Sequence, residues 1–534
     1  MTRDLDSDPG CNAGSNADSS EGRTKRRSRR RAKNERQPGQ HVPRDVDYRH
    51  LRNPFPPINV FSEDRIEAMH VAAFDALENL GLKVLLPAAR QLFRAGGATV
   101  DEKSQMVYIG REMVEAALAS APASITCRAA TRSKDVTLEL GSLVFQPAAG
   151  APHATDLQRG RRPGCARDLR ELIKITEHFD VLHMVPPLVE PQDIDINLRH
   201  YFTMQAQLQL TEKLPFIFSR GTPQVEQSFE MLQQFRGLSD DEFAAHPHTH
   251  TIINTNSPRQ LDIPMAQGLI DFARYNQVSI VTPFTLMGAM APITVAGAMT
   301  LSHAEALAGI TLTQLVNPGA PVCYGTFTSN VDMKSGSPAF GTPEHFKASL
   351  AAGQLARRTG LPWRCASGSA ANIADVQAAN ENQFGLWGCL LSGATITVHA
   401  AGWLEGGLSV SYEKLITDIE VLQMVAELCH ETHSDDAAIG LDALAEVQPG
   451  GHFFAAQHTL SRYQTEFYEP LVADWSNFGT WTEKGGKTAT ERATAIWQNI
   501  VDDDTKIDID CSKAEELENY IARQTAAGGA PPQS

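Results

Sequence analysis

Paired cysteines are absent from this chain of 534 residues, whose eight cysteines form no CxxC pair and no dense cluster. A zinc ribbon and a disulfide framework both need such spacing, so neither is predicted. We interpret Cys323 and Cys365, which fall on expected strands, as small buried side chains. This cysteine usage is typical of the reducing cytoplasm, which is the location we expect.

The sequence also lacks the signals of a nucleotide-binding site, a secreted protein and a membrane span. No glycine-rich GxGxxG turn joins a strand to a helix, which argues against a site for a nucleotide or S-adenosylmethionine. No apolar stretch follows the basic run near the N-terminus, so that run is not a secretory signal. Residues 278–303 lack charged side chains, but Pro283, Gly288, Pro292 and Gly297 within them favour a buried strand and loop over a membrane span.

Charge is distributed unevenly along the chain. The 47 basic and 63 acidic residues give a net charge of −16, but residues 1–50 hold 12 Lys and Arg against 8 Asp and Glu. We expect residues 1–50 to form a disordered basic tail, with docking on an acidic partner or RNA as the alternative to a solvated tail. The remaining acidic body argues against nucleic acid as the main partner.

Apolar, β-branched runs alternate with helical runs from residue 144 onward, which indicates strands that feed helices through short loops. The expected strands are 144–150, 181–189, 214–221, 250–258, 279–287, 321–329, 361–369 and 394–402. The expected helices are 166–179, 197–211, 223–235, 264–275, 298–316, 343–359, 375–392 and 412–430. Eight such pairs predict an α/β fold, a (β/α)8 TIM barrel with helical N- and C-terminal additions, in which reactive groups gather at the carboxyl ends of the strands.

This pattern also sets the expected domains. Residues 51–142 mix helices with short strands and are expected to form a cap before the barrel. The barrel itself is expected over residues 143–436. Residues 437–534 are expected to form a C-terminal helical extension, in which we find no motif.

The loop after the eighth expected strand has the most suggestive side chains. His399 follows four β-formers, so its imidazole is expected at the barrel mouth, where it donates to a substrate carboxylate or responds to pH. The alternative is a buried structural histidine. Trp403 offers an indole face to a quaternary ammonium, and Glu405 adds a negative charge. The alternative for Glu405 is a charge that only stabilises the following turn.

Aromatic residues near the sixth and seventh expected strands form a second candidate group. Tyr324 and Phe327 are spaced by three around a strand end, so they are candidates for one wall of a pocket. Asp332 in the same loop is a candidate anchor of that loop. Trp363 is expected to point inward on the seventh strand, whereas Trp387 lies in the middle of a helix and is expected in the core.

Polar residues of two other loops complete the candidate site. Asp156, with His153 beside it, follows the first strand and is expected at the mouth. Four residues of the loop and helix after the seventh strand are assigned to the rim of the pocket; they are Gly368, Ser369, Gln377 and Glu381. The alternative for the helix is structural, with Asp375 as its N-terminal cap and Gln377 and Glu381 on one polar face.

Three histidines in the segment HPHTH have the spacing of a metal site. They are His246, His248 and His250. Pro247 interrupts the regular alternation and no fourth ligand is evident, so we assign no metal to this segment.

Several multi-residue motifs resemble one known family. They are GAMAPITVAGAM (288–299), HAEALAGITLTQL (303–315), NPGAPVCYG (317–325), DMKSGSPAFGTPE (332–344), DVQAANE (375–381) and VHAAGWLEGGLSVSYEKLITDIE (398–420). Together they resemble the trimethylamine methyltransferase family over roughly residues 50–500. The archaeal trimethylamine enzymes of that family carry pyrrolysine, whereas this chain has standard residues only. It is therefore similar to the branch without pyrrolysine, whose characterised members act on quaternary amines such as glycine betaine.

The resemblance implies a methyltransferase that moves a methyl group from a quaternary or tertiary methylamine to the Co(I) corrinoid of a partner protein. It implies no tightly bound cofactor, because the corrinoid is carried by that separate protein. We also expect a homo-oligomer and no membrane partner. Two alternatives remain open from the residues alone: a barrel lyase or metal-dependent hydrolase that uses the histidines, and a non-catalytic amine-binding protein or scaffold for the corrinoid protein.

Overall fold

The computed structural model describes residues 46–503, 507 and 509–533. Most of the expected basic tail, residues 1–45, therefore lies outside the described residues. The described chain divides into two units. The larger consists of Asp47–Thr432, Glu469–Ile509 and Lys513–Ser534, and the smaller contains His433–Tyr468 and Asp510–Ser512. The expected domain limits remain predictions.

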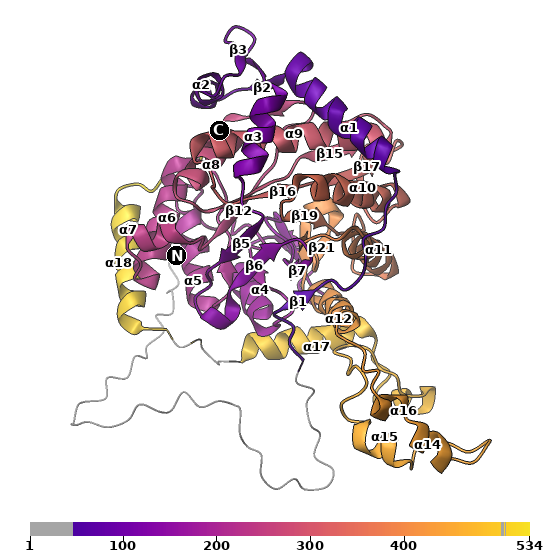
Figure 1. The fold of residues 1–534 in the computed structure, drawn as a ribbon. Coiled ribbons are helices and arrows are strands. Elements are labelled where there is room, and N and C mark those ends of the chain that lie inside the picture. Colours follow the sequence, from indigo (N-terminus) through magenta and orange to yellow (C-terminus); the bar gives the residue numbers. More distant parts are fainter. Residues whose placement is uncertain (1–45, 504–506, 508, 534) are drawn as a thin grey trace, which may run out of the picture. The chain divides into compact units, whose positions relative to one another are not determined.

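A seven-stranded sheet lies at the centre of the larger unit (Figure 1). Its order is β1 (Leu51–Arg52), β7 (Ser142–Phe145), β20 (Ile396–Val398), β19 (Trp363–Ala366), β16 (Val322–Gly325), β14 (Val278–Val281) and β12 (His250–Ile253). All neighbouring pairs are parallel except β1 with β7. Parallel strands need crossover connections, and helices provide them here.

Backbone contacts continue from β12 through two short strands to β7. Phe216 forms a parallel bridge with His250, which links β12 to β11 (Leu214–Pro215). β11 pairs in parallel with β10 (Met184–Val185). Beside β10, the His183 N–H donates to the Phe145 carbonyl at the end of β7 over 2.9 Å. β7 is thus contacted both by β20 and by the segment that begins β10.

Helices follow the strands as the sequence predicts. They are α4 (Ala166–His178), α5 (Arg199–Leu210), α6 (Thr222–Arg236), α8 (Ile263–Arg274), α9 (Val295–Val316), α10 (Pro343–Thr359), α11 (Val376–Ser392) and α12 (Tyr412–Leu428). A short additional helix, α7 (Asp240–Ala245), precedes β12. The eight expected strand–helix pairs and the mixed α/β class are confirmed.

Alternate residues of the strands face two different cores. Ile280, Cys323, Ile396 and Val398 belong to one apolar cluster. The antiparallel hairpin of β5 (Ser124–Cys127) and β6 (Val136–Glu139) adds four side chains to the same cluster. The intervening residues, among them Val281, Tyr324 and Trp363, pack in another cluster with side chains of the surrounding helices. This alternation decides which strand residues can reach a central site.

Residues before the hairpin form a helical and mixed segment. They comprise α1 (Glu63–Asp75), the π-helical turn Ala76–Leu80, β2 (Leu82–Val84), α2 (Pro87–Ala95), β3 (Thr99–Asp101), β4 (Met106–Tyr108) and α3 (Arg111–Ser120). β2 pairs with β4, and also in parallel with β13 (Gln260–Leu261) in the loop after β12. Side chains of α1, α2 and α3 share a core with α9.

Two smaller sheets, one of three strands and one of four, lie in the loops after the central strands. They are built by β8 (His153–Thr155), β9 (Arg162–Pro163), β15 (Phe284–Met287), β17 (Phe327–Val331), β18 (Pro338–Ala339), β21 (Trp403–Leu404) and β22 (Ser409–Ser411). The strand β22 pairs with both β21 and β8. The loops after β7 and β20 are therefore joined.

After α12, the smaller unit contains α13 (Asp436–Ile439), α14 (Leu441–Glu446) and α15 (Gln457–Arg462). The chain returns to the larger unit with α16 (Phe478–Glu483) and α17 (Ala489–Asp502), where Trp497 joins the core that contains Tyr412 of α12. In α18 (Cys511–Ala526), Leu517 and Tyr520 pack with side chains of α5 and α6. Within the described residues, no helix is both long and apolar enough to span a bilayer.

Candidate active site

His399 and Trp403 form the centre of the candidate site. His399 follows β20 directly and has φ +58°, a left-handed conformation that is uncommon for a residue with a side chain. This conformation turns the chain sharply after the strand. The centre of its imidazole lies 3.4 Å from the centre of the Trp403 indole, with the planes inclined at 45°. Both residues are 7% exposed, so the two rings form a buried contact.

Phe327 extends this contact into an aromatic cluster, which we define as Phe284, Phe327, Phe340, His399 and Trp403. The Phe327 ring centre lies 5.1 Å from Phe284, 5.2 Å from Phe340, 5.4 Å from His399 and 6.0 Å from Trp403. The five residues come from loops after three different central strands. Such faces attract a quaternary ammonium through their negative electrostatic potential.

Two glycines determine where the Trp403 indole lies. A Cβ on Gly368 would meet Trp403 Cδ1 at 2.9 Å, and a Cβ on Gly407 would meet Cζ2 at 2.5 Å. Both glycines have positive φ, +119° and +105°. The indole therefore packs between two backbone segments that only glycine allows to approach so closely. Gly368 therefore packs directly against the indole, and its expected place at the rim of the pocket remains a prediction.

Arg364 is a buried cation beside the aromatic cluster. It lies on β19 and pairs with Ile396 of β20, so it shares the inward side of the strands, and it is 1% exposed. Its guanidinium carbon lies 5.0 Å from the Phe327 ring centre, and Nη1 donates to the Thr326 carbonyl over 2.8 Å. Nε has no hydrogen-bond partner among the described residues. Burial lowers the pKa of Arg364 to about 10, so it stays cationic at neutral pH.

His399 is neutral in this environment. Burial, and secondarily the charge of Arg364, hold its pKa well below the ordinary value of 6.5. The imidazole therefore offers one N–H donor and one nitrogen acceptor. Nδ1 of His399 and Nε1 of Trp403 have no hydrogen-bond partner in the described part of the chain. His399 can therefore donate to a substrate carboxylate only as a neutral imidazole, and the buried positive charge beside it belongs to Arg364.

Further polar atoms line the same side of the strands. Gln146 follows β7, and its carbonyl accepts from the Ala400 N–H, which places Gln146 beside the loop that contains His399. Its Oε1 lies 2.8 Å from Nε2 of His250. Within the described chain, Gln146 Nε2 and His250 Nδ1 have no partner. Since buried polar groups are nearly always hydrogen-bonded, these unpartnered atoms on the inward side of the strands are candidates for contact with a ligand.

Glu381 and Asn382 fix the loop after β19. One carboxylate oxygen of Glu381 accepts from the Ser369 hydroxyl at 2.6 Å and from the Ala370 N–H at 2.8 Å. Its other oxygen accepts from Gln377 at 2.7 Å. The Asn382 amide joins this loop to the one after β20, because it accepts from Gly368 N–H and donates to the Ala400 carbonyl. The hydrogen bonds of Ser369, Gln377 and Glu381 therefore fix the conformation of this loop. None of these hydrogen bonds involves a residue of the aromatic cluster.

Glu405 lies in the same loop as Trp403, but its carboxylate is already paired. It accepts from Arg161 Nε at 2.8 Å and from the Ser409 hydroxyl at 2.7 Å. Although burial opposes ionisation, these hydrogen bonds lower the pKa of Glu405. The carboxylate is thus anionic and neutralised by Arg161. This carboxylate is therefore already paired within the protein and is not free to pair with a substrate cation.

Tyr324 and Trp363 lie on the outward side of their strands, away from the aromatic cluster. The Tyr324 hydroxyl lies 3.1 Å from Nδ1 of His303 on α9, and the Trp363 indole donates to the Gly393 carbonyl over 2.8 Å. Both belong to the core shared with the helices. Trp387, which the sequence placed in the core, is 37% exposed on α11; that expectation was wrong because the apolar residues of this helix do not mark one face.

Asp156 and Asp332 also make contacts of their own. Buried Asp156 pairs with Arg159 at 2.6 Å and with Arg162 at 2.8 Å. Exposed Asp332 accepts from the Ser335 hydroxyl at 2.7 Å, so it caps its own turn as an anchor of that loop. Neither carboxylate is found in the aromatic cluster.

His248 and His250 of HPHTH have different surroundings. The His248 ring stacks on Phe243 with centres 5.5 Å apart, whereas His250 contacts Gln146 and Phe216. Among the described residues, no group of three or more His, Cys, Asp or Glu side chains is arranged to hold a metal ion.

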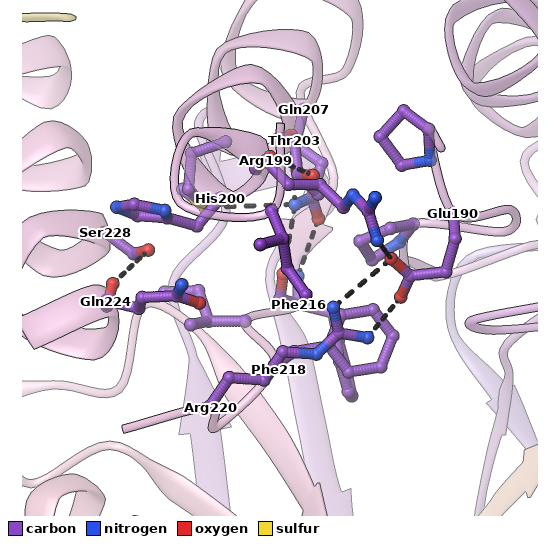
Figure 2. Close-up of a pocket in the computed structure, with 15 residues that line it drawn as sticks. Glu190, Arg199, His200, Thr203, Gln207, Phe216, Phe218, Arg220, Gln224 and Ser228 are labelled. Atoms are coloured by element: carbon purple, nitrogen blue, oxygen red, sulfur yellow. Dashed lines mark hydrogen bonds and ion pairs between the residues drawn. The ribbon is translucent and has the colours of Figure 1, made fainter. Parts of the chain in front are cut away.

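A pocket lies between the loops after β10 and β11 and the helices α5 and α6 (Figure 2). Glu190 accepts from Arg220 and from Arg199, whose Nη1 lies 3.3 Å away. The Gln207 amide donates to the Phe216 carbonyl over 3.0 Å. The cavity measures about 30 Å³, which is room for a buried water molecule.

Sequence reasoning missed Arg364, Gln146, Phe284 and Phe340. Arg364 left one signal: a charged residue in a run otherwise typical of a strand buried on both faces must point toward a partner or a ligand. The two phenylalanines left none, because a single Phe in a loop is compatible with any apolar contact.

Comparison with known proteins agrees with the motifs. Residues 23–529 match the family described as trimethylamine methyltransferase (MTTB). The chain is 32% identical over 471 residues to the glycine betaine methyltransferase of Desulfitobacterium hafniense strain Y51, an alignment that covers 88% of this chain and 98% of that protein. It is 28% identical over 441 residues to trimethylamine methyltransferase MttB of Desulfitobacterium hafniense strain DSM 10664 / DCB-2, covering 81% and 87% of the two chains.

A solved structure shows a weaker similarity. The monomethylamine methyltransferase MtmB of Methanosarcina barkeri aligns with a TM-score of 0.45 and 10% sequence identity, covering 85% of this chain and 92% of that one.

Proposed function

The chain belongs to the trimethylamine methyltransferase family, and we propose that it takes a methyl group from a carboxylated quaternary amine such as glycine betaine and passes it to the Co(I) corrinoid of a separate protein. One observation favours this substrate class over a simple methylamine. Arg364 is a buried cation beside an aromatic cluster, and no carboxylate of the described residues pairs with it. A betaine supplies both the carboxylate and the quaternary nitrogen that such a site can bind.

The architecture that we propose is a closed (β/α)8 barrel. Three connections support closure: the parallel pair of β20 with β7, the bridge from β12 to β11, and the hydrogen bond from His183 to Phe145. Closure would bring the loops after β7, β16, β19 and β20 to one mouth. These are the loops and strand ends that carry Gln146, Phe327, Arg364 and His399.

Recognition of the carboxylate would depend on Arg364. A guanidinium forms short, charge-assisted hydrogen bonds to a carboxylate, and burial strengthens them. The neutral imidazole of His399 and the indole N–H of Trp403 are further donors whose atoms have no partner in the described chain. An unpaired buried charge is costly, so a bound carboxylate would relieve an unfavourable feature of the free protein.

Recognition of the ammonium would depend on aromatic faces. Phe327 and Trp403 lie at the centre of the cluster, and their aromatic faces attract the quaternary cation more strongly than the neutral tertiary amine that leaves. A cation without a carboxylate would face the repulsion of Arg364 without compensation. This is why glycine betaine suits the site better than choline or tetramethylammonium.

The reaction needs little acid–base chemistry from the protein. The methyl carbon passes to the acceptor while the C–N bond breaks, and the electron pair of that bond stays on nitrogen. The amine therefore leaves as a neutral tertiary amine without gaining a proton. What remains for these residues is to orient the methyl group, hold the carboxylate and exclude water, which agrees with the absence of an unpaired acid among the described residues of the aromatic cluster. The corrinoid would arrive with the partner protein and supply the methyl acceptor.

Equilibrium titration tests the proposed substrate class. Glycine betaine should bind, and choline, which has the same trimethylammonium group but a hydroxyl in place of the carboxylate, should bind at least about tenfold more weakly. Equal affinity for the two ligands would refute recognition through a carboxylate. Trimethylamine serves as the third ligand, because preferential binding of that amine would point instead to the chemistry named for the MttB relatives.

A further inference from the structure

The turn from His399 to Trp403 carries the two rings at the centre of the candidate site, and its backbone is strained. His399 has φ +58°, a conformation that is unfavourable for a residue with a side chain. Main-chain hydrogen bonds connect residues 400–402 to the segment after β7 and to β22. A strained turn persists only where its surroundings determine it fully. The side chains that hold this turn therefore help to decide where the two rings lie.

One buried side chain, Asn382 of α11, binds the backbone on both sides of the indole. Its Nδ2 donates to the Ala400 carbonyl over 3.2 Å, in the turn after β20. Its Oδ1 accepts from the Gly368 N–H over 3.1 Å, in the loop after β19. Gly368 packs directly against the Trp403 indole. Asn382 therefore ties the turn that carries the indole to the glycine that supports it.

The Ser367 hydroxyl adds a contact to the same turn. It lies 3.2 Å from the His399 carbonyl oxygen and 3.2 Å from Oδ1 of Asn382, so its single proton can be donated to either oxygen. Ser367 and Asn382 are both fully buried. A buried hydroxyl or amide without a partner is strongly unfavourable, so both side chains are held to the turn by the hydrogen bonds that satisfy them.

Asp418 of α12 binds the other end of the turn. Its Oδ2 accepts from the Gly402 N–H over 2.9 Å, directly before Trp403. Lys414 donates to the two carboxylate oxygens at 2.9 Å and 2.8 Å, which compensates the charge of a buried carboxylate. Burial raises the pKa of Asp418, although Lys414 and hydrogen bonds from Gly402 and Asn382 oppose this shift. Asn382 and Asp418 therefore belong to one network, which spans both loops.

We propose that Asn382 is a positioning residue for methyl transfer, which sets where His399 and Trp403 meet the substrate. The inference rests on the proposed function, because it assumes that these two rings bind the amine. The methyl carbon, the nitrogen and the acceptor must be aligned, and a displacement of about 1 Å can reduce the rate about hundredfold. Asn382 acts on the reaction through the two rings and not through contact with the substrate.

Near-ultraviolet circular dichroism tests the position of the indole. The contribution of Trp403 is the difference between a protein and the same protein with Trp403→Phe. Asn382→Ala should change this contribution, because the indole loses its fixed surroundings. Asn317→Ala is the matched control: the Asn317 amide also donates to a backbone carbonyl, that of Ala273 over 3.0 Å, but in the segment before β16. The control should keep the Trp403 contribution of the wild type.

Binding and kinetics extend the test to the reaction. Asn382→Ala should raise the Kd for glycine betaine about tenfold and lower kcat for methyl transfer to reduced free cobalamin about hundredfold. Asn317→Ala should keep both values. Ser367→Ala removes only a hydroxyl and provides a milder variant if Asn382→Ala does not fold. It should raise the Kd about threefold.

Two results would overturn the inference. An unchanged Trp403 contribution in both Asn382→Ala and Ser367→Ala would show that the turn keeps its position without these side chains. A loss of stability in urea unfolding with unchanged Kd and kcat would make Asn382 a residue of the fold alone. The Trp403 contribution is measured without ligand, so it separates this inference from the proposed substrate, whose failure would appear as a wild type that does not bind glycine betaine.

Discussion

The guanidinium carbon of Arg364 lies 5.0 Å from the ring centre of Phe327. This relationship joins the two recognition elements that a betaine requires, a cation for the carboxylate and aromatic faces for the ammonium. It also separates the proposed substrate from methylamines without a carboxylate, because the buried charge would repel them.

Replacing Arg364 should weaken binding and stabilise the free protein. Arg364→Met removes a charge-assisted hydrogen bond to the carboxylate, so the affinity for glycine betaine should fall by about 2–3 kcal/mol. The same change removes an unpaired buried charge, so the free energy of unfolding without ligand should rise by about 1 kcal/mol. Calorimetric titration and thermal unfolding measure the two effects. Arg358→Met, in an ion pair with Glu67, is the control that should leave binding intact; an equal loss in both variants would exclude a specific role.

Trp403 should contribute to binding through its indole face. Trp403→Ala should cost about 1–2 kcal/mol in affinity for glycine betaine, because it removes one aromatic face from the ammonium. Trp387→Ala on the exposed side of α11 is the control and should bind normally. Isothermal titration of both variants decides the point, since an unchanged affinity of Trp403→Ala would remove this residue from the site.

Gly368 should tolerate no side chain. A Cβ there would lie 2.9 Å from Trp403 Cδ1, and the residue has φ +119°. Gly368→Ala should therefore displace the indole and weaken glycine betaine about tenfold, a loss of about 1.4 kcal/mol. Gly360→Ala separates the two causes, because Gly360 also has positive φ but no atom near its Cβ position. That variant should lose about 1 kcal/mol of stability and keep its affinity; similar affinity losses in both would contradict the steric argument.

The stability of the protein should fall in mild acid. Burial lowers the pKa of His345 to about 4, whereas an unfolded histidine titrates near 6.5. The contribution of His345 is therefore fully present above pH 6.5 and is lost as the pH falls toward 4, at up to about 1.4 kcal/mol per pH unit. Urea unfolding of wild type and His345→Gln from pH 8 to 4.5 measures this difference. The variant should show the shallower loss, and parallel curves would refute the assignment; the comparison at pH 8 isolates the packing cost.

The order of strands and helices was readable because each apolar, β-branched run is followed by a run with a helical pattern. Asp375, for example, was identified as a helix cap, and its carboxylate accepts from the Gln377 and Ala378 N–H groups. Local chemistry of this kind is encoded within a few residues of the chain.

The direction of side chains on the strands was not readable. Trp363 and Arg364 are neighbours on a strand that is buried on both faces, so apolar alternation could not show which of them points inward. Because Trp363 was expected to point inward, its neighbour Arg364 was not considered as a site residue. The same ambiguity applies to Tyr324 on β16, whereas Phe327 and Trp403 lie beyond the ends of the central strands, where the sequence analysis expected site residues.

The sequence also could not show which charged residues form ion pairs with each other. Glu405 is bound by Arg161, which lies 244 positions away in the chain. Without that pairing, a carboxylate two residues from Trp403 suggests a partner for the substrate cation. Only the fold shows that its charge is already compensated.

Methyl transfer to reduced free cobalamin, followed by the spectral change from Co(I) to methyl-Co(III), tests the central claim most directly. Glycine betaine, choline and trimethylamine would be offered at equal concentration to the wild type and to Arg364→Met. The account predicts methylation from glycine betaine by the wild type, a large loss in the variant, and little or no product from the other two amines. Transfer from choline or trimethylamine at the rate seen with glycine betaine, or full activity in Arg364→Met, would contradict it.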